Sequence, residues 1–228
     1  MHKTALDHAR LFFETYAIAE GSVIVDLGSQ DVTGSLRDVS PKNAKYVGVD
    51  FEEAKGVDIV ITNPYSLPFV DQSVDVCVSS SCFEHSEFFW LVFLEIMRIL
   101  KPSGLLYLNV PSNGYFHRYP VDCWRFYPDS GIALQNWGRR NGHSTTLLES
   151  FTGQQKSGVW NDFVAVFVKD EKFSELYPDR IQALTGDYTN GLSLGREGFS
   201  NPSIAPEDQQ AFSRRVRKKI QRLLGLPQ

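Results

Sequence analysis

Cysteine is scarce in this chain, and so are long apolar runs and any excess of positive charge. The three cysteines, Cys77, Cys82 and Cys123, form no C-x-x-C pair and leave an odd count. A disulfide framework and a zinc site are therefore not expected, and we predict no bound metal. This use of cysteine is typical of a reducing compartment, so we expect a cytoplasmic protein.

No stretch is long and apolar enough to indicate a membrane span or a signal peptide. The most hydrophobic run, FFWLVFLEIM at 88–97, contains Glu95 and is much shorter than a bilayer span, so it predicts a buried helix. The segment MHKTALDHARLFFETYA carries charges throughout and lacks the apolar centre of a signal peptide. The net charge of −4 gives no general reason to expect a nucleic-acid partner.

The chain does contain the pattern of an α/β sheet. Its 228 residues, 42% of them apolar, suffice for one core with appendages. Apolar runs rich in β-branched residues alternate with helical stretches, which indicates βαβ units and a parallel sheet. Strands are expected at 23–27, 46–50, 57–61, 74–79 and 105–110, and helices at 5–17, 84–100 and 129–141.

Two consecutive strand patterns, STTLLESF and WNDFVAVFVK, follow with no room for a crossover helix, so they should pair antiparallel. The predicted fold class is α/β, a Rossmann-like doubly wound sheet with five parallel strands and a C-terminal antiparallel hairpin.

We place one domain at 1–170, including the N-terminal helix, and an extension at 171–228. Within the extension, ALTGDYTNGLSLG indicates a loop. The segment PEDQQAFSRRVRKKIQRLLG predicts a basic amphipathic helix, which can contact an anionic membrane, meet an acidic partner, or dock with its charged face in solvent. The sequence leaves these readings open, and it leaves a homodimer open as well.

The first strand runs into an unusual glycine turn, VIVDLGSQDVTGSLR. A dinucleotide loop follows G-x-G-x-x-G, but here Gly28 is followed by Ser29, Gln30 and Asp31, which put bulk and negative charge where a pyrophosphate would sit. A cofactor without paired phosphates, such as S-adenosylmethionine, meets no such obstacle, and an acid such as Asp26 or Asp31 could bind its ammonium group.

Asp50 ends the second strand in YVGVD. A carboxylate at this place can accept hydrogen bonds from both ribose hydroxyls. The alternative is a helix cap or turn residue, because Asp favours both.

Several segments together resemble the class I S-adenosylmethionine-dependent methyltransferases, particularly small bacterial ones with a methyltransferase-11-like core. The resemblance runs from about Ser22 to Lys169 and rests on the order of VIVDLGSQDVTGSL, YVGVD, SLPFVDQSVDVCVSSSCFEH, LEIMRILKPSGLLYLNVPS and WNDFVAVFVK. It implies S-adenosylmethionine as the cofactor. The cofactor-binding residues it implies are Asp26, Gly28, Ser29, Asp50, Phe51, Asn63, Ser80 and Ser81.

Two details depart from the family pattern: the second loop glycine is absent, and Asn63 stands where the family often places an acid beside adenine. The tripeptide Asn63-Pro64-Tyr65 also resembles the N-P-P-Y motif of nucleic-acid amino methyltransferases, but a proline-fixed turn is the preferred interpretation.

The stretch PSNGYFHRYPVDCWRFYPD at 111–129 follows the fifth strand and should lie over the strand ends. Methyl transfer to a hydroxyl needs alignment of the acceptor and removal of its proton. Our catalytic candidates are His117 as preferred base, Asp122 as its partner, and His85, while Arg118, Tyr119, Trp124 and Arg125 are candidates for substrate binding. The structural alternative pairs Arg125 with Asp122 or Asp129 and makes Trp124 part of the core.

The pattern H-R-Y-P-V-D-C-W-R-F-Y-P resembles that of methyltransferases linked to cell-surface sugar biosynthesis. The sequence therefore predicts an oxygen-directed methyltransferase for a small-molecule or sugar acceptor, and no nucleic-acid partner is expected. A nicotinamide-dependent oxidoreductase and a non-catalytic nucleotide-binding module are the alternatives.

Overall fold

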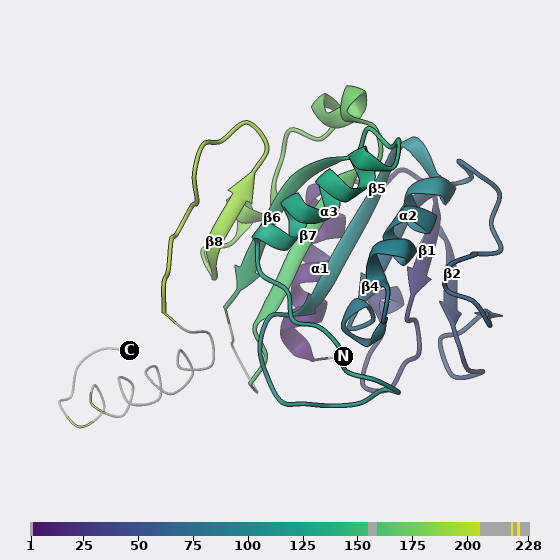
Figure 1. Cartoon of the computed structure of the whole chain (residues 1–228), viewed down its shortest axis with the longest axis horizontal. Helices are drawn as coiled ribbons and strands as arrows, with labels where there is room; N and C mark the ends of the chain where they lie inside the picture. Colours follow the sequence, from purple (N-terminus) through teal and green to yellow (C-terminus); the bar gives the residue numbers. More distant parts are fainter. Residues whose placement is uncertain (1, 155–158, 206–219, 221–222, 224–228) are drawn as a thin grey trace.

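The computed structural model describes residues 2–154, 159–205, 220 and 223. These residues form an eight-stranded sheet with helices on both faces (Figure 1). The strands are β1 (Val23–Leu27), β2 (Lys45–Asp50), β3 (Ile59–Val60), β4 (Val74–Ser80), β5 (Leu100–Pro111), β6 (Thr146–Gly153), β7 (Asp162–Val168) and β8 (Tyr188–Ser193). The helices are α1 (Lys3–Thr15), α2 (Phe89–Ile99), α3 (Asp129–Arg140) and α4 (Ile181–Leu184), with 3-10 turns η1 (Leu36–Asp38), η2 (Phe83–His85) and η3 (Glu171–Leu176).

The strand order is β3-β2-β1-β4-β5-β7-β6-β8. Strands β1 to β5 are parallel, and β7 lies antiparallel between β5 and β6. The predicted doubly wound sheet with its antiparallel hairpin is therefore confirmed. The carboxyl ends of β1, β2, β4 and β5 meet at one edge, where ligands bind in such sheets.

Two apolar layers hold this edge rigid. Val25 and Leu27 of β1 pack into the layer that contains Phe93 of α2 and Leu134 of α3. Ile24, on the opposite face of the same strand, packs into the layer of α1. Successive residues of a strand point to opposite faces, and β1 is buried on both of them, as expected for a central parallel strand.

Two sequence expectations were wrong in detail. The helix expected at 84–100 begins only at Phe89, because residues 83–85 form η2. It ends at Ile99, and β5 begins at Leu100, since Pro102 lacks an N–H and disfavours helix at the residue before it.

The loop expected in ALTGDYTNGLSLG contains β8, which pairs antiparallel with β6. Its pairing carries an irregularity, and Asn190 adopts a left-handed conformation with φ of 52°. Asn and Gly within a short run suggest a turn, so the strand was missed.

The basic helix predicted at 206–225 lies outside the described residues apart from 220 and 223, and the division at residue 170 stays a prediction. Within the described part of the chain, no helix has the length and apolar character needed to cross a bilayer.

Candidate active site

A cavity of about 430 Å³ lies at the carboxyl ends of β1, β2 and β4. Part of its wall comes from the loop 112–128, which follows β5 and which we call the cavity loop. In Figure 1 this loop runs along the edge of the sheet where β5 ends. The predicted site residues that line the cavity are Gly28, Asp50, Phe51, Ser80, Ser81, His85 and Tyr119.

The turn after β1 requires a glycine at position 28. Gly28 has φ of +83°, and a Cβ built on it would lie 2.7 Å from Cβ of Cys82. Both the left-handed conformation and the close approach exclude a side chain here. The turn thus leaves room beside the strand ends for a ligand that approaches the backbone closely.

Asp50 faces the same cavity from the end of β2. Its Oδ2 accepts a hydrogen bond of 3.1 Å from the N–H of Gln30, and its Oδ1 accepts one of 2.7 Å from the N–H of Phe51. Each oxygen has further lone-pair capacity for a ligand hydroxyl. The ring of Phe51 lines the cavity and is 50% exposed, so it offers a face for stacking. A glycine turn, a carboxylate and an aromatic ring fit the adenosine of S-adenosylmethionine.

Three residues predicted for the cofactor do not line the cavity. Asp26 is buried, its Oδ2 accepts a hydrogen bond of 2.7 Å from Tyr46 Oη, and burial raises its pKa to about 7. Ser29 is buried as well, whereas Asn63 is exposed and accepts a hydrogen bond of 2.9 Å from the N–H of Tyr65. The proline-fixed turn at Asn63 is therefore present, and the cofactor roles of these residues stay predictions.

The cavity loop is tied across the cavity by two hydrogen bonds. Tyr119 Oη donates to Oε1 of Gln30, in the loop after β1, at 2.5 Å. His85 Nδ1 lies 2.5 Å from the carbonyl oxygen of Val121, which makes this nitrogen the donor and leaves Nε2 as the nitrogen with a lone pair. The cavity loop is therefore bonded both to the loop after β1 and to η2, and the three segments together line the cavity.

Asp122 and Arg125 form an ion pair within the cavity loop. Arg125 donates to the two oxygens of Asp122 at 2.5 and 2.9 Å and to the carbonyl of Tyr115 at 2.8 Å. Hydrogen bonds from Arg125 lower the pKa of Asp122 to about 2. The pairing considered as the structural alternative is thus present, and it fixes the shape of the loop.

The other residues predicted for the substrate lie outside the cavity lining. Arg118 is exposed. Trp124 donates from Nε1 to the carbonyl of Ser86 at 2.9 Å and packs edge-on against Phe89 and Trp90. Trp124 therefore helps to anchor the cavity loop on the start of α2.

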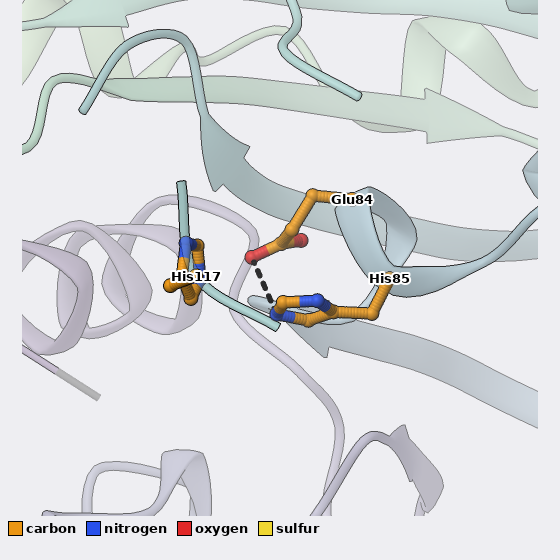
Figure 2. A group of neighbouring side chains, drawn as sticks. All are labelled: Glu84, His85 and His117. Atoms are coloured by element: carbon orange, nitrogen blue, oxygen red, sulfur yellow. Dashed lines mark ion pairs between the residues drawn. The ribbon is translucent and has the colours of Figure 1, made fainter. Parts of the chain in front are cut away.

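Glu84, His85 and His117 form a cluster, of which His85 lines the cavity (Figure 2). Glu84 is 0% exposed, and its Oε1 lies 3.7 Å from His85 Nε2. Burial raises the pKa of Glu84 to about 8 and lowers the pKa of His85. His117 packs edge-on against His85 with ring centroids 4.9 Å apart, and its backbone N–H donates to Asp122 at 2.7 Å. His117 itself does not line the cavity.

Sequence reasoning assigned no role to Gln30 or Glu84. Gln30 was noted only as bulk in the glycine turn, and its polar side chain in a ligand loop was the one available signal. Glu84 carried no signal, because a carboxylate in the segment CFEHSE is expected at the surface.

Part of the chain is similar in sequence to known methyltransferases. Residues 21–108 match the family model of a methyltransferase domain. A Mycobacterium avium protein named as an uncharacterized methyltransferase is 34% identical over 118 residues, which are 51% of this chain and 43% of that protein. The matched stretch therefore spans less than half the length of that relative.

Solved structures share the fold at low sequence identity. The 1,6-didemethyltoxoflavin-N1-methyltransferase of Burkholderia thailandensis, solved with S-adenosylhomocysteine, has a TM-score of 0.59 at 14% identity, over 74% of this chain and 80% of that one. The [4+2]-cyclase SpnF has a TM-score of 0.54 at 14% identity, over 73% and 82%. Residues 21–108 therefore match a methyltransferase domain in sequence, and the described sheet has the fold of a solved methyltransferase.

Proposed function

We propose that this chain transfers a methyl group from S-adenosylmethionine to a hydroxyl group of a small-molecule or sugar acceptor. The observation that carries the proposal is the cavity at the strand ends, in which a glycine turn, a half-buried carboxylate and an aromatic ring face one space. Such an edge of a doubly wound sheet is where nucleotide-like ligands bind.

The cofactor-binding roles follow from the cavity lining. Asp50 accepts hydrogen bonds from the ribose hydroxyls, and Phe51 stacks beside the adenine. The backbone at Gly28 lies along the amino-acid part, and Ser80 and Ser81 contact the region of the sulfonium. The bound cofactor supplies a methyl group already activated by its sulfonium, so the protein mainly aligns the acceptor and removes its proton.

A buried acid-base cluster supports an oxygen acceptor, because a hydroxyl must lose its proton during the transfer. We assign the removal of this proton to His85, which lines the cavity. Its Nδ1 donates to the carbonyl of Val121, so its Nε2 carries the lone pair that can accept the proton. His117 lies directly behind it and is the second candidate base. Asp122 positions His117 through the backbone hydrogen bond.

Aromatic rings with polar neighbours support a sugar-like acceptor. Tyr119 and Trp124 expose 57% and 36% of their surface on the cavity loop, near the exposed Arg118. Ring faces and forked donors suit polyhydroxylated ligands, and we assign a role in glycan biosynthesis on this ground. The Burkholderia thailandensis enzyme, crystallised with a small molecule and S-adenosylhomocysteine, gives the small-molecule part of the proposal a precedent in the same fold.

The protein is also proposed to work in a reducing cytoplasm, because its three cysteines are unpaired.

The test combines binding with turnover. Thermal-shift measurements should show stabilisation by S-adenosylhomocysteine and none by NAD. Radiolabelled S-adenosylmethionine is then incubated with a panel of sugar nucleotides, glycosides and matched amines, and label should appear in a hydroxylated acceptor. Stabilisation by NAD alone would overturn the cofactor assignment. Label found only in amines would overturn the direction toward oxygen. Tight binding without transfer to any acceptor would favour a non-transferring role, for which the cyclase of the same fold is a precedent.

A further inference from the structure

We propose that Glu84, His85 and His117 bind one divalent transition-metal ion of the zinc type at the wall of the cavity. The cluster joins two segments that are far apart in the sequence, the turn η2 and the cavity loop. Metal binding itself does not depend on the proposed methyl transfer, whereas the role of the ion toward an acceptor rests on it.

The three side chains are close enough to share an ion. One ligand atom of each lies within 4.8 Å of those of the other two. Zinc binds nitrogen and oxygen at about 2.0 to 2.2 Å, so ligand atoms in a tetrahedral site lie about 3.3 to 3.6 Å apart. Glu84 Oε1 and His85 Nε2, at 3.7 Å, are already near this spacing. His117 must therefore move to bring its ring nitrogen to the same spacing, and its partly exposed side chain lies on the cavity loop.

Glu84 gives an independent reason for a cation. Its side chain is aimed at the two imidazoles (Figure 2), it is fully buried, and no other described residue donates a hydrogen bond to its carboxylate oxygens. An ionised carboxylate in such a place is costly unless a positive charge compensates it. The nearby guanidinium of Arg125 is paired with both oxygens of Asp122. We therefore place the compensating ion between Glu84 and the two imidazoles.

Both imidazoles have the outer contacts that metal-binding histidines use. His85 Nδ1 donates to the carbonyl of Val121 at 2.5 Å. His117 Nδ1 lies 3.2 Å from the carbonyl of Tyr115 and 3.4 Å from Oδ2 of Asp122. A carbonyl or carboxylate on one ring nitrogen fixes the tautomer and leaves the other nitrogen to bind the metal.

Two imidazoles and one carboxylate form the donor set of catalytic zinc sites, which keep a further position open. Magnesium prefers oxygen donors and water, so it is not the expected ion. With the ion bound, His85 Nε2 would be a ligand, so the ion would replace His85 and His117 in the role of general base proposed above. An acceptor hydroxyl that coordinates the open position would lose its proton to solvent, because the ion lowers the hydroxyl pKa.

A metal-free alternative is a proton held by Glu84 and shared with His85 across their 3.7 Å separation. This alternative predicts no specific metal affinity, so direct binding separates the two.

The experiment uses the full chain, freed of metal with a chelator and titrated with Co²⁺ as a spectroscopic substitute for zinc. Visible absorption of the ion should saturate at one Co²⁺ per chain, and Zn²⁺ should displace it while Mg²⁺ should not. Glu84→Gln and His117→Ala should each weaken Co²⁺ binding more than about 100-fold, beyond the loss caused by removing an outer-shell partner. His143 lies between α3 and β6, outside the cluster, and His143→Ala should leave the affinity unchanged.

Each variant is checked for folding by its binding of S-adenosylhomocysteine, which also reports on the cofactor site separately. Absence of saturable Co²⁺ and Zn²⁺ binding by the wild-type chain would overturn the metal site while leaving the methyltransferase proposal intact. Equal affinity in wild type, Glu84→Gln and His117→Ala would overturn it as well, because binding would then lie elsewhere.

Discussion

Replacing Asp50 with alanine tests the cofactor site at a single side chain. Within the described residues, its two oxygens accept hydrogen bonds from the backbone N–H groups of Gln30 and Phe51, at 3.1 and 2.7 Å. Both donors lie in loops beside the cavity, so the substitution removes a ligand contact with little disturbance of the core. We expect a large loss of S-adenosylhomocysteine affinity and a small loss of stability.

The size of the loss follows from the number of hydrogen bonds. Hydrogen bonds to a charged group contribute about 1.5 to 3 kcal/mol each. Two ribose hydroxyls on one carboxylate therefore give about 3 to 6 kcal/mol, and each 1.4 kcal/mol is about a factor of ten in affinity. Because Asp50 is only half-buried, water competes for these bonds and the lower end applies, which is a weakening of about 100-fold.

Isothermal titration calorimetry with S-adenosylhomocysteine measures this change. Asp50→Asn keeps one acceptor oxygen and should fall between wild type and Asp50→Ala. Glu53→Ala removes a neighbouring exposed carboxylate that does not line the cavity, so its affinity should equal that of wild type. An unchanged affinity in Asp50→Ala would remove this residue from the cofactor site and refute the reasoning.

Three further predictions concern the turn, the loop and the pH response. Gly28→Ala should lower the free energy of unfolding by about 1 to 3 kcal/mol more than Gly142→Ala. Both glycines have similar positive φ, but only a Cβ at position 28 would meet Cys82. Equal losses of unfolding free energy in chemical denaturation would refute the clash. Tyr119→Phe removes the bond between the cavity loop and the loop after β1 and should cost about 1 kcal/mol, seen as faster hydrogen exchange in the cavity loop and not in α3. Asp162 is buried, which raises its pKa, but hydrogen bonds from two histidines outweigh this and lower it. Its contribution is therefore present above the unfolded pKa of about 3.9 and is lost as pH falls through the lower folded pKa, so Asp162→Asn should destabilise strongly at pH 7 and progressively less below about pH 4 in urea unfolding.

The central sheet could be predicted from the sequence because its pattern is local. Val25 and Leu27 on one face and Ile24 on the other make β1 an apolar run that is interrupted by Asp26, as expected for a parallel strand between two helical layers. The turn at Gly28 was readable from its place after the strand, whereas the close approach of Cys82 to it was not.

The cluster at the cavity wall could not be predicted in the same way. Glu84 lies under the cavity loop, in which the backbone N–H of Cys123 donates to the carbonyl of Glu84 at 2.8 Å. His117 reaches the cluster through the same loop path, which is set by the ion pair of Asp122 and Arg125. Such contacts depend on tertiary structure, which the hydrophobic periodicity of the sequence does not reveal.

The hydrogen bond between Tyr119 and Gln30 has a thermodynamic consequence for the order of events. Gln30 belongs to the loop after β1, which we assign to the cofactor, and Tyr119 belongs to the cavity loop, which we assign to the acceptor. A ligand that orders one segment lowers the entropic cost of ordering the other. Linkage makes this effect reciprocal, so each ligand should bind more tightly once its companion is in place.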